Sequence, residues 1–518
     1  MAIRNSDSIQ YGPFIDGVFY DRDEEDVAEA GISSMQNMRV QAAGAVETRL
    51  GSKSYQGLAG ISLAPSVTMC CEFIVPPTTK YVVIVAGNKI YKYASGAWID
   101  ISGTVSITVD DDATFEWADA NGTLYATNGS DSPWKWTGSS VAVVVPSSTT
   151  DQVASGAEHI AFWDNRLWYG NQGTNYDRVW YSDIANPDTV GVSSFYNLGS
   201  QVTGLMPMQN SLTIHTESGI HTLVPTGNAT IPYQLQQRTH EGTVSGRAIV
   251  RLPQNRQLMI RNDGIYMWEG GDDIEKKTYN LDLNYWPSLI KSRFKQSFGL
   301  YFPEENEAWF WVPHGTGQVG MNHIIVYSDK YDMWYGPYNG SGAYFTRNCA
   351  ALVDDKPHAG TLNDSGNVGG KLEDHWPAGV WNDDDNSSAG ALLNQYFVTG
   401  APAPEGSDSR VRWRYARTYY DATGNFEVTV TQESSGLSGT TNSINMAGGG
   451  FTLNNDKTDE ATLGTVRMLS RDTDLTEYDP HTSLKFSNAV LNNFFRIRRT
   501  HPVFSKIGRK RKPKPGVS

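Results

Sequence analysis

The sequence predicts an all-β protein, and three observations favour this fold class. Short aromatic strands are joined by turns rich in Gly and Asn, as in residues 161–191. Aromatic residues make up 11% of the chain and there are 50 glycines, whereas charged residues reach only 19%, which is typical of many short strands and tight turns. The strand–turn–strand pattern also recurs about every 45 residues, the spacing of propeller blades. We therefore expect a β-propeller of six or seven blades.

Six repeats follow one another, each marked by an aromatic or aliphatic residue in the strand after its turn. The gaps between successive markers are 43, 45, 42, 45 and 59 residues, and the markers are Tyr93, Trp136, Tyr181, Leu223, Trp268 and Tyr327. A weaker seventh repeat lies between Ala350 and Leu372. A single four-stranded blade cannot bury both of its faces, whereas a ring of blades can. The alternative is a tandem of irregular β-sandwiches with chance spacing.

The segments that flank the repeats predict a smaller β domain formed by the N- and C-terminal parts of the chain. We place an N-terminal segment of this domain at residues 1–70 and the propeller at 71–376. Residues 377–495 form the C-terminal part of the β domain, in which residues 411–420 and 426–431 alternate with a period of two. Residues 496–518 are expected to be an extended basic tail.

Charge is unevenly distributed along the chain. The net charge is −14, but nine basic residues and no acidic one occur between Arg496 and Lys514, so the other 33 basic and 56 acidic residues give the rest −23. An acidic body repels a phosphate backbone. The tail contacts nucleic acid or an acidic partner, or is simply a solvated terminus.

The three cysteines and the apolar runs bear on where the protein is made. Cys70, Cys71 and Cys349 show no ligand spacing, and we expect reduced thiols in a protein made in a cytoplasm. We expect no transmembrane helix and no signal peptide, because no long apolar span and no apolar N-terminal core occur.

Motifs for chemistry are sparse, so we expect no catalytic, cofactor-binding or metal site. The sequence has no GxSxG, HExxH or GxxxxGK[ST] motif. Asp263 and Glu269 flank a strand, as a glycosidase pair would, but chance acidic pairs are common. His215 and His221 are six residues apart, which suits a metal pair or ordinary polar strand positions. The tryptophans of the repeats form either a sugar-stacking platform or, as we favour, packing between blades.

Two further patterns have competing interpretations. The acidic runs, which include Asp354 and Asp355, either supply calcium ligands or, as we favour, lie in solvated loops. Residues 412–419 interleave arginines with aromatic residues, which is typical of single-stranded nucleic-acid binding or of one core face and one charged face. We favour the second interpretation.

Two stretches resemble a known family. Residues 165–188 (NRLWYG … RVWYSDIANPD) and the earlier Asn37 … Gly44 … Glu47-Thr48-Arg49-Leu50-Gly51-Ser52 are similar to the tail nozzle of short-tailed double-stranded DNA phages, also called tail tubular protein B or packaged-DNA stabilisation protein. The family often has Arg-Pro-Gly-Thr at this point, whereas in this chain Leu50 replaces the proline and Ser52 replaces the threonine. The resemblance covers residues 35–334.

This resemblance implies a structural virion protein and not an enzyme. It implies a homo-hexameric ring, each subunit carrying a propeller, which hangs below the adaptor ring, conducts and retains double-stranded DNA without reading its sequence, and docks tail fibres or spikes. The protein would be assembled in the host cytoplasm and reside in the virion tail. The alternative is a propeller that binds or degrades glycans.

Two sets of residues follow as candidates from this expected function. In a six-fold ring every inward carboxylate is repeated six times at one height, so acidic loops would keep DNA off the wall. The candidate channel-lining residues are Asp110, Asp111, Asp112, Asp383, Asp384 and Asp385. The candidate contacts to the adaptor end are Arg496, Arg498, Arg499, Lys506, Arg509, Lys510, Arg511 and Lys512.

Overall fold

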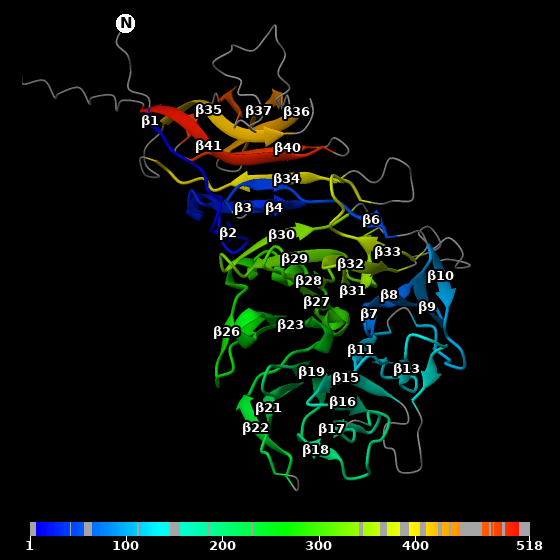
Figure 1. Ribbon diagram of the computed structural model, residues 1–518. Coiled ribbons are helices and arrows are strands. Elements are labelled where there is room, and N and C mark those ends of the chain that lie inside the picture. Colours follow the sequence, from blue (N-terminus) through cyan, green and yellow to red (C-terminus); the bar gives the residue numbers. More distant parts are fainter. Residues whose placement is uncertain are drawn as a thin grey trace, which may run out of the picture. The chain divides into compact units, whose positions relative to one another are not determined.

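The computed structural model consists almost entirely of β-strands in two compact units (Figure 1). One unit comprises residues 1–49, 333–338 and 392–518, and the other comprises 50–332 and 339–391. The structure describes residues 7–41, 43–55, 65–110, 113–145, 156–184, 186–228, 231–340, 345–362, 370–383, 393–404, 411–422, 427–434, 437–445, 469–475, 478–479, 481–488 and 493–506. Within these ranges, no helix is long and apolar enough to cross a membrane.

The second unit is a β-propeller of seven antiparallel sheets, which confirms the predicted fold class. The first three sheets are β7 to β10 (Val67–Val75, Thr79–Ala86, Lys89–Ala94, Ala97–Asp100), β11 to β14 (Glu116–Asp119, Leu124–Thr127, Trp134–Trp136, Val143–Val144) and β15 to β18 (Ala157–Trp163, Arg166–Gln172, Asn175–Tyr181, Phe195–Asn197). The next three are β19 to β22 (Val202–Pro207, Leu212–Thr216, Gly219–Pro225, Tyr233–Thr239), β23 to β26 (Ile249–Leu252, Arg256–Arg261, Gly264–Trp268, Ile274–Lys276) and, within this unit, β27 to β29 (Phe298–Phe302, Glu307–Val312, His323–Ser328).

The seventh sheet is closed by a strand from the start of the chain. It consists of β31, β32 and β33 (Arg347–Val353, Lys356–Thr361, Leu372–Asp374), and β6 (Lys53–Ser54) pairs with β33. The weaker repeat predicted between Ala350 and Leu372 therefore forms the seventh blade of the propeller. The boundary predicted at residue 70 is wrong, because Lys53 and Ser54 belong to the propeller, where they cover the open edge of a sheet that has only three strands of its own.

The first strands of the sheets face one another around the ring. Strand β11 contacts β15, β15 contacts β19, β19 contacts β23, β23 contacts β27, β27 contacts β31 and β31 contacts β7. The circle is completed by a core cluster shared by β7 of the first sheet and β12 and β13 of the second. All six predicted markers lie in the third strands of their sheets. Short 3-10 helices interrupt the propeller at η2 to η6 (Gly246–Ala248, Pro253–Asn255, Tyr279–Leu281, Trp286–Ser288, Lys291–Gln296).

The core of the propeller consists of aromatic and aliphatic side chains between neighbouring sheets. Trp168, Trp180, Trp309 and Trp311 are each at most 2% exposed, and the Trp163 and Trp168 rings contact the Tyr233 ring of the next sheet. These tryptophans cannot form a sugar platform on the surface. The interpretation as packing between blades is confirmed.

One buried ion pair lies inside the seventh sheet. Arg347 on β31 is 0% exposed, and its guanidinium is bonded to the Glu373 carboxylate on β33, which is 1% exposed. Ser52, just before β6, also donates a hydrogen bond to Glu373. In the same sheet Asp354 and Asp355 have φ of 49° and 62° and form the tight hairpin turn between β31 and β32, which needs this left-handed backbone. The turn accounts for this acidic pair without calcium.

The first unit contains two larger sheets built from both ends of the chain, as expected for the smaller domain. One sheet has the order β38-β35-β41-β5-β4 (Leu469–Asp474, Val411–Ala422, Phe495–Lys506, Val46–Thr48, Met38–Val40), with β1 (Asp7–Ser8) on β41 and β39 (Tyr478–Asp479) on β35. The other has the order β2-β3-β34-β40-β36-β37 (Gly17–Val18, Gly31–Gln36, Gln395–Thr399, Ser483–Asn488, Glu427–Ser434, Leu437–Asn445). This unit also contains η1 (Glu24–Asp26) and β30 (Met333–Tyr338).

The predicted boundary between this domain and the tail is also wrong. Residues 495–506 form the long strand β41, which pairs with β35 along its whole length. On β35, Trp413 is 0% exposed and packs on Phe504 of β41, whereas Arg412 is exposed. This confirms the interpretation that residues 412–419 present one core face and one charged face. The tail beyond residue 506 lies outside the described residues.

Candidate functional site

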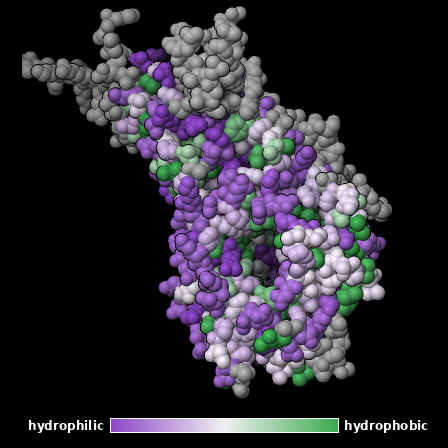
Figure 2. All heavy atoms as spheres, in the orientation of Figure 1, coloured by the Kyte–Doolittle hydropathy of each residue, from purple (hydrophilic) through white to green (hydrophobic). Residues whose placement is uncertain are grey.

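One cavity in the propeller lies at the starts of several first strands. It has a volume of about 620 Å³ and is lined by residues at the starts of β11, β15 and β19, by the segment 240–247, by the β24–β25 turn and by Lys295 of η6. A central opening is also visible on the propeller face of Figure 2. Because this cavity collects polar side chains from several sheets, it is the best candidate for a functional site.

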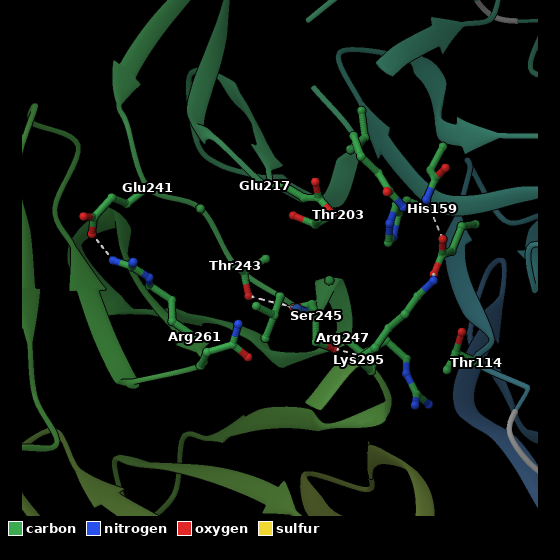
Figure 3. A pocket seen from close by; sticks show the side chains of 18 of the residues that line it. Thr114, His159, Thr203, Glu217, Glu241, Thr243, Ser245, Arg247, Arg261 and Lys295 are labelled. Atoms are coloured by element: carbon green, nitrogen blue, oxygen red, sulfur yellow. Dashed lines mark hydrogen bonds and ion pairs between the residues drawn. The ribbon is translucent and has the colours of Figure 1, made fainter. Parts of the chain in front are cut away.

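Most of the charged groups in this cavity are paired. Glu116 on β11 contacts the His159 ring on β15 at 2.9 Å, and Glu158 accepts a bond from Lys295 at 2.8 Å. Figure 3 shows His159, Arg247 and Lys295 on one side of the cavity and the bonded pair of Glu241 and Arg261 on the other. Glu116 and His159 join the second and third sheets, whereas Glu158 of the third sheet pairs with Lys295, which lies between the fifth and sixth sheets. The pairs therefore link separate parts of the ring at its opening.

Arg247 of η2 lies between this cavity and a second one of about 370 Å³, because it lines both. Its two terminal nitrogens donate to the carbonyls of Asn348 and Gln296, each at 2.6 Å. Burial lowers the pKa of Arg247 to about 10. The guanidinium therefore remains charged at neutral pH and places a fixed positive charge inside the ring.

The pKa of His159 depends on the neighbouring Glu116 carboxylate. Burial by itself lowers the pKa of His159, but the charge of Glu116 and its hydrogen bond outweigh burial, and the pKa is raised above its ordinary value of 6.5. Gly246 allows this contact, because a Cβ at this position would lie 2.8 Å from Glu116 Oε1 and 2.9 Å from His159 Nδ1.

Replacing Glu116 with glutamine is expected to lower the pKa of His159, since the cost of burial stays and the compensating charge is lost. Histidine NMR titration measures this pKa, with an H159Q variant to assign the signal.

Because the folded pKa of His159 is raised, its contact with Glu116 adds stability that is fully present below about pH 6.5 and is lost as pH rises through the folded pKa. The difference in unfolding free energy between wild type and E116Q should thus be larger at pH 6 than at pH 8.5. E217Q, at an exposed residue lining the same cavity, is the control; an equal shift in E217Q would contradict the assignment.

The predicted channel-lining acids have different fates. Asp110 is exposed, which agrees with a lining role but does not test it. Asp383 is only 3% exposed, so the prediction that it lines a channel is wrong. Its carboxylate lies close enough to Glu373 to raise the pKa of that residue. Asp111, Asp112, Asp384 and Asp385 lie outside the described residues.

The predicted basic contacts are partly used inside the chain. Arg496 on β41 is bonded to Glu47 at 2.5 Å, and Arg498 is bonded to Asp421 at 2.7 Å. Arg499 stacks on the Tyr419 ring at 4.7 Å. Acids on β5 and β35 thus pair with Arg496 and Arg498 within the chain, and a contact of these residues to a partner stays a prediction. Lys506 ends β41, and Arg509, Lys510, Arg511 and Lys512 lie outside the described residues.

The other candidate groups are not assembled into a catalytic or metal centre. Asp263 lines the cavity and accepts a hydrogen bond from Tyr266 at 2.6 Å, whereas Glu269 is exposed and does not line it. His215 is buried, bonds Gln257 at 2.9 Å, and has its pKa lowered to about 4 by burial. The described parts of the chain hold no group of three or more His, Cys, Asp or Glu side chains placed to bind one metal ion.

The residues that do come together in the cavity were not predicted from the sequence. Glu116 is the first residue of β11, and Glu158 and His159 are the second and third residues of β15. Aligning the repeats by their first strands instead of their turns would have shown this polar start. Arg247 and Lys295 lie in short 3-10 segments between sheets. No periodic pattern marks such positions, so no sequence signal predicts them.

Comparisons with known proteins give a fold and no family. No family model matches the chain, and no curated protein matches it. Similar solved structures include the WD40 domain of Pan2 from Neurospora crassa, with 9% identity over 66% of this chain and 97% of that one and a TM-score of 0.41. They also include the WD40 β-propeller domain of Doa1 (9%, 64% and 99%, TM-score 0.40). A third is a catalytically inactive virginiamycin B lyase from Staphylococcus aureus with quinupristin (10%, 63% and 98%, TM-score 0.43). These likenesses concern the fold alone.

Proposed function

We propose that this chain is the subunit of a phage tail nozzle, a six-fold ring that conducts DNA during ejection, helps to retain packaged DNA and docks fibres or spikes. The observation that carries the proposal is the seven-sheet propeller, which occupies most of the stretch that resembles the nozzle family. The first unit, built from both chain ends, supports it by offering a platform for contacts between subunits.

The charges support a conduit. The chain outside its basic C-terminal segment carries a net −23, and a wall of this sign repels phosphates so that DNA slides without adhering. Within the cavity Glu158 and Glu241 are each paired with a cation, and Glu116 contacts the His159 ring. We therefore propose a structural protein and not an enzyme.

The ring is tested by its mass and symmetry. The full chain, alone or with its adaptor ring, is expected to give six-fold class averages in negative-stain images and a particle mass of six chains. Antibody labelling should place it in the virion tail. A protein that stays monomeric and is absent from purified virions would contradict the proposal.

The polar cavity favours one alternative, a propeller that binds or degrades glycans, because its volume and hydroxyl-rich lining suit a sugar unit. However, none of the described residues that line it is Trp, Tyr or Phe, the side chains on which sugars stack. Binding or turnover of host surface polysaccharide that disappears in E217Q and D263N, with no ring formed, would favour the alternative.

Charge reversal at Asp110 tests the conduit itself. D110K is expected to slow DNA ejection by introducing six cations that hold phosphates, and added salt should relieve the defect because phosphate contacts weaken with ionic strength. Ejection is followed by the fluorescence of a DNA dye. D110N, which removes the charge without reversing it, is the matched control. Normal ejection by D110K would exclude Asp110 from the wall.

The basic tail is tested by cutting the chain after Lys506. Because β41 ends there, the shortened chain should keep its melting temperature yet bind the adaptor ring more weakly, as measured by pull-down or sedimentation. A cut after Thr500 would instead remove half of the β35–β41 pairing and confuse docking with folding. Unchanged docking after loss of residues 507–518 would refute a role for the tail.

A further inference from the structure

Cys70 and Cys349 meet across the seam where the propeller closes. Cys70 lies on β7, the first strand of the first sheet, and Cys349 lies on β31, the first strand of the last. The two strands are packed against each other, and both cysteines belong to one buried cluster together with Val67. The Cys349 thiol donates to the Val67 carbonyl at 3.6 Å, and the Cys349 thiol lies close enough to Cys70 to raise its pKa.

We infer that Cys70 and Cys349 are a disulfide-forming site that locks the propeller ring. Both cysteines are free in this structure. The inference does not depend on the proposed nozzle function, because it rests only on the contacts of the seam.

The neighbouring Cys71 is excluded from this site by the geometry of the strand. Successive side chains on a strand point to opposite faces, and Cys71 accordingly packs in a different cluster, between the first and second sheets. The second cavity, of about 370 Å³, is lined by Cys70 and Cys349 but not by Cys71. A small reagent entering the ring therefore reaches one pair of thiols and not the third.

The surroundings of the pair determine its reactivity. The neighbouring Cys349 thiol and burial raise the pKa of Cys70, whereas the Arg247 guanidinium, which lines the same cavity, opposes this rise. The thiolate is the attacking species, so the reaction should quicken as pH rises.

The step is a thiol–disulfide exchange with a small-molecule disulfide as oxidant. One thiol loses its proton and attacks a sulfur of the reagent, which forms a mixed disulfide and releases one reagent thiolate. The second protein thiolate then attacks the mixed disulfide, forms the Cys70–Cys349 bond and releases the second reagent thiol. Two protein thiols are oxidised and one reagent disulfide is reduced to two thiols.

The bond would enclose the 278 residues between Cys70 and Cys349, which include most of the propeller. A cross-link over so long a segment restricts the unfolded chain strongly. It would join covalently the two sheets that are otherwise held at the seam by strand packing and by the two-residue strand β6.

The test treats the full-length protein with 2-hydroxyethyl disulfide at pH 8.5, followed by thiol counting in denaturant and peptide mapping. Wild type is expected to fall from three reactive thiols to one, to give a linked Cys70–Cys349 peptide, and to melt several degrees higher until dithiothreitol reverses the change. C71S should also lose two thiols and show the same rise in melting temperature. C70S and C349S should form no link and show no rise.

Three results would overturn the inference: three thiols remaining in wild type after saturating reagent, a linked peptide that contains Cys71, or a link between two chains. If C70S or C349S fails to fold, the peptide map of wild type and the C71S variant still decide the question.

Discussion

Replacing Arg347 with alanine is expected to lower the free energy of unfolding of the propeller by about 3–5 kcal/mol, the usual cost of leaving a buried charge without its partner. Arg347 is 0% and Glu373 1% exposed, so water cannot replace the lost cation. The guanidinium also donates to His375 Nε2 at 3.2 Å. Guanidinium denaturation followed by tryptophan fluorescence measures the loss. A double variant, R347M/E373L, removes both charges and should recover part of it.

The loss in R347A should depend on pH. Burial raises the pKa of Glu373 despite the opposing charge of Arg347. The folded state therefore keeps a proton on Glu373 at pH values where the unfolded chain has released it, and stability falls as pH rises through that window, from about the ordinary pKa upward. Without Arg347 the window extends to higher pH, so R347A should lose the most at neutral pH. A loss of unfolding free energy below about 1 kcal/mol in R347A at neutral pH would contradict an ion pair that is shielded from water.

Replacing Trp168 with alanine is expected to cost about 3–5 kcal/mol, because the large cavity that it leaves cannot collapse. Trp168 on β16 is 0% exposed, and its ring lies 5.2 Å from the Tyr181 ring and 5.1 Å from the Tyr233 ring of the next sheet. Its Nε1 also donates to the Trp163 carbonyl at 3.0 Å. The variant therefore weakens the contact between the third and fourth blades.

Trp117 offers a matched control for this experiment. It is 38% exposed, so W117A should change the unfolding free energy by no more than about 0.5 kcal/mol. Both variants are measured by guanidinium denaturation at the same pH. Equal losses in W117A and W168A would show that the contact between blades is not what Trp168 contributes.

The blades were predictable because their signals are local. A hairpin such as Gly87-Asn88, between β8 and β9, requires turn residues next to the strands that they connect, and the period of the markers follows from the repetition. The packing role of Trp168 follows from the same regularity, since a ring of sheets must bury both faces of each one.

The features that escaped prediction depend on residues far apart in the chain. Arg496 was assigned to a partner because its segment has no nearby acid, yet Glu47 pairs with it 449 residues away. Asp383 was placed on a surface because it lies in an acidic run, but tertiary packing buries it. The cavity residues Arg247 and Lys295 lie in the segments before and after the fifth sheet, which contact each other through the bond from Arg247 to the Gln296 carbonyl.

The pairing of Ser54 with Glu373 has a consequence for how the protein is made. The strand that completes the last blade is translated 319 residues before its partner. At about 5–20 residues per second, it leaves the ribosome roughly 15–65 s earlier. Over that interval the nascent chain holds an unpaired edge, and six blades accumulate as an open arc. The circle closes only after synthesis passes β33, so a ribosome that stalls before that point releases an arc and no ring.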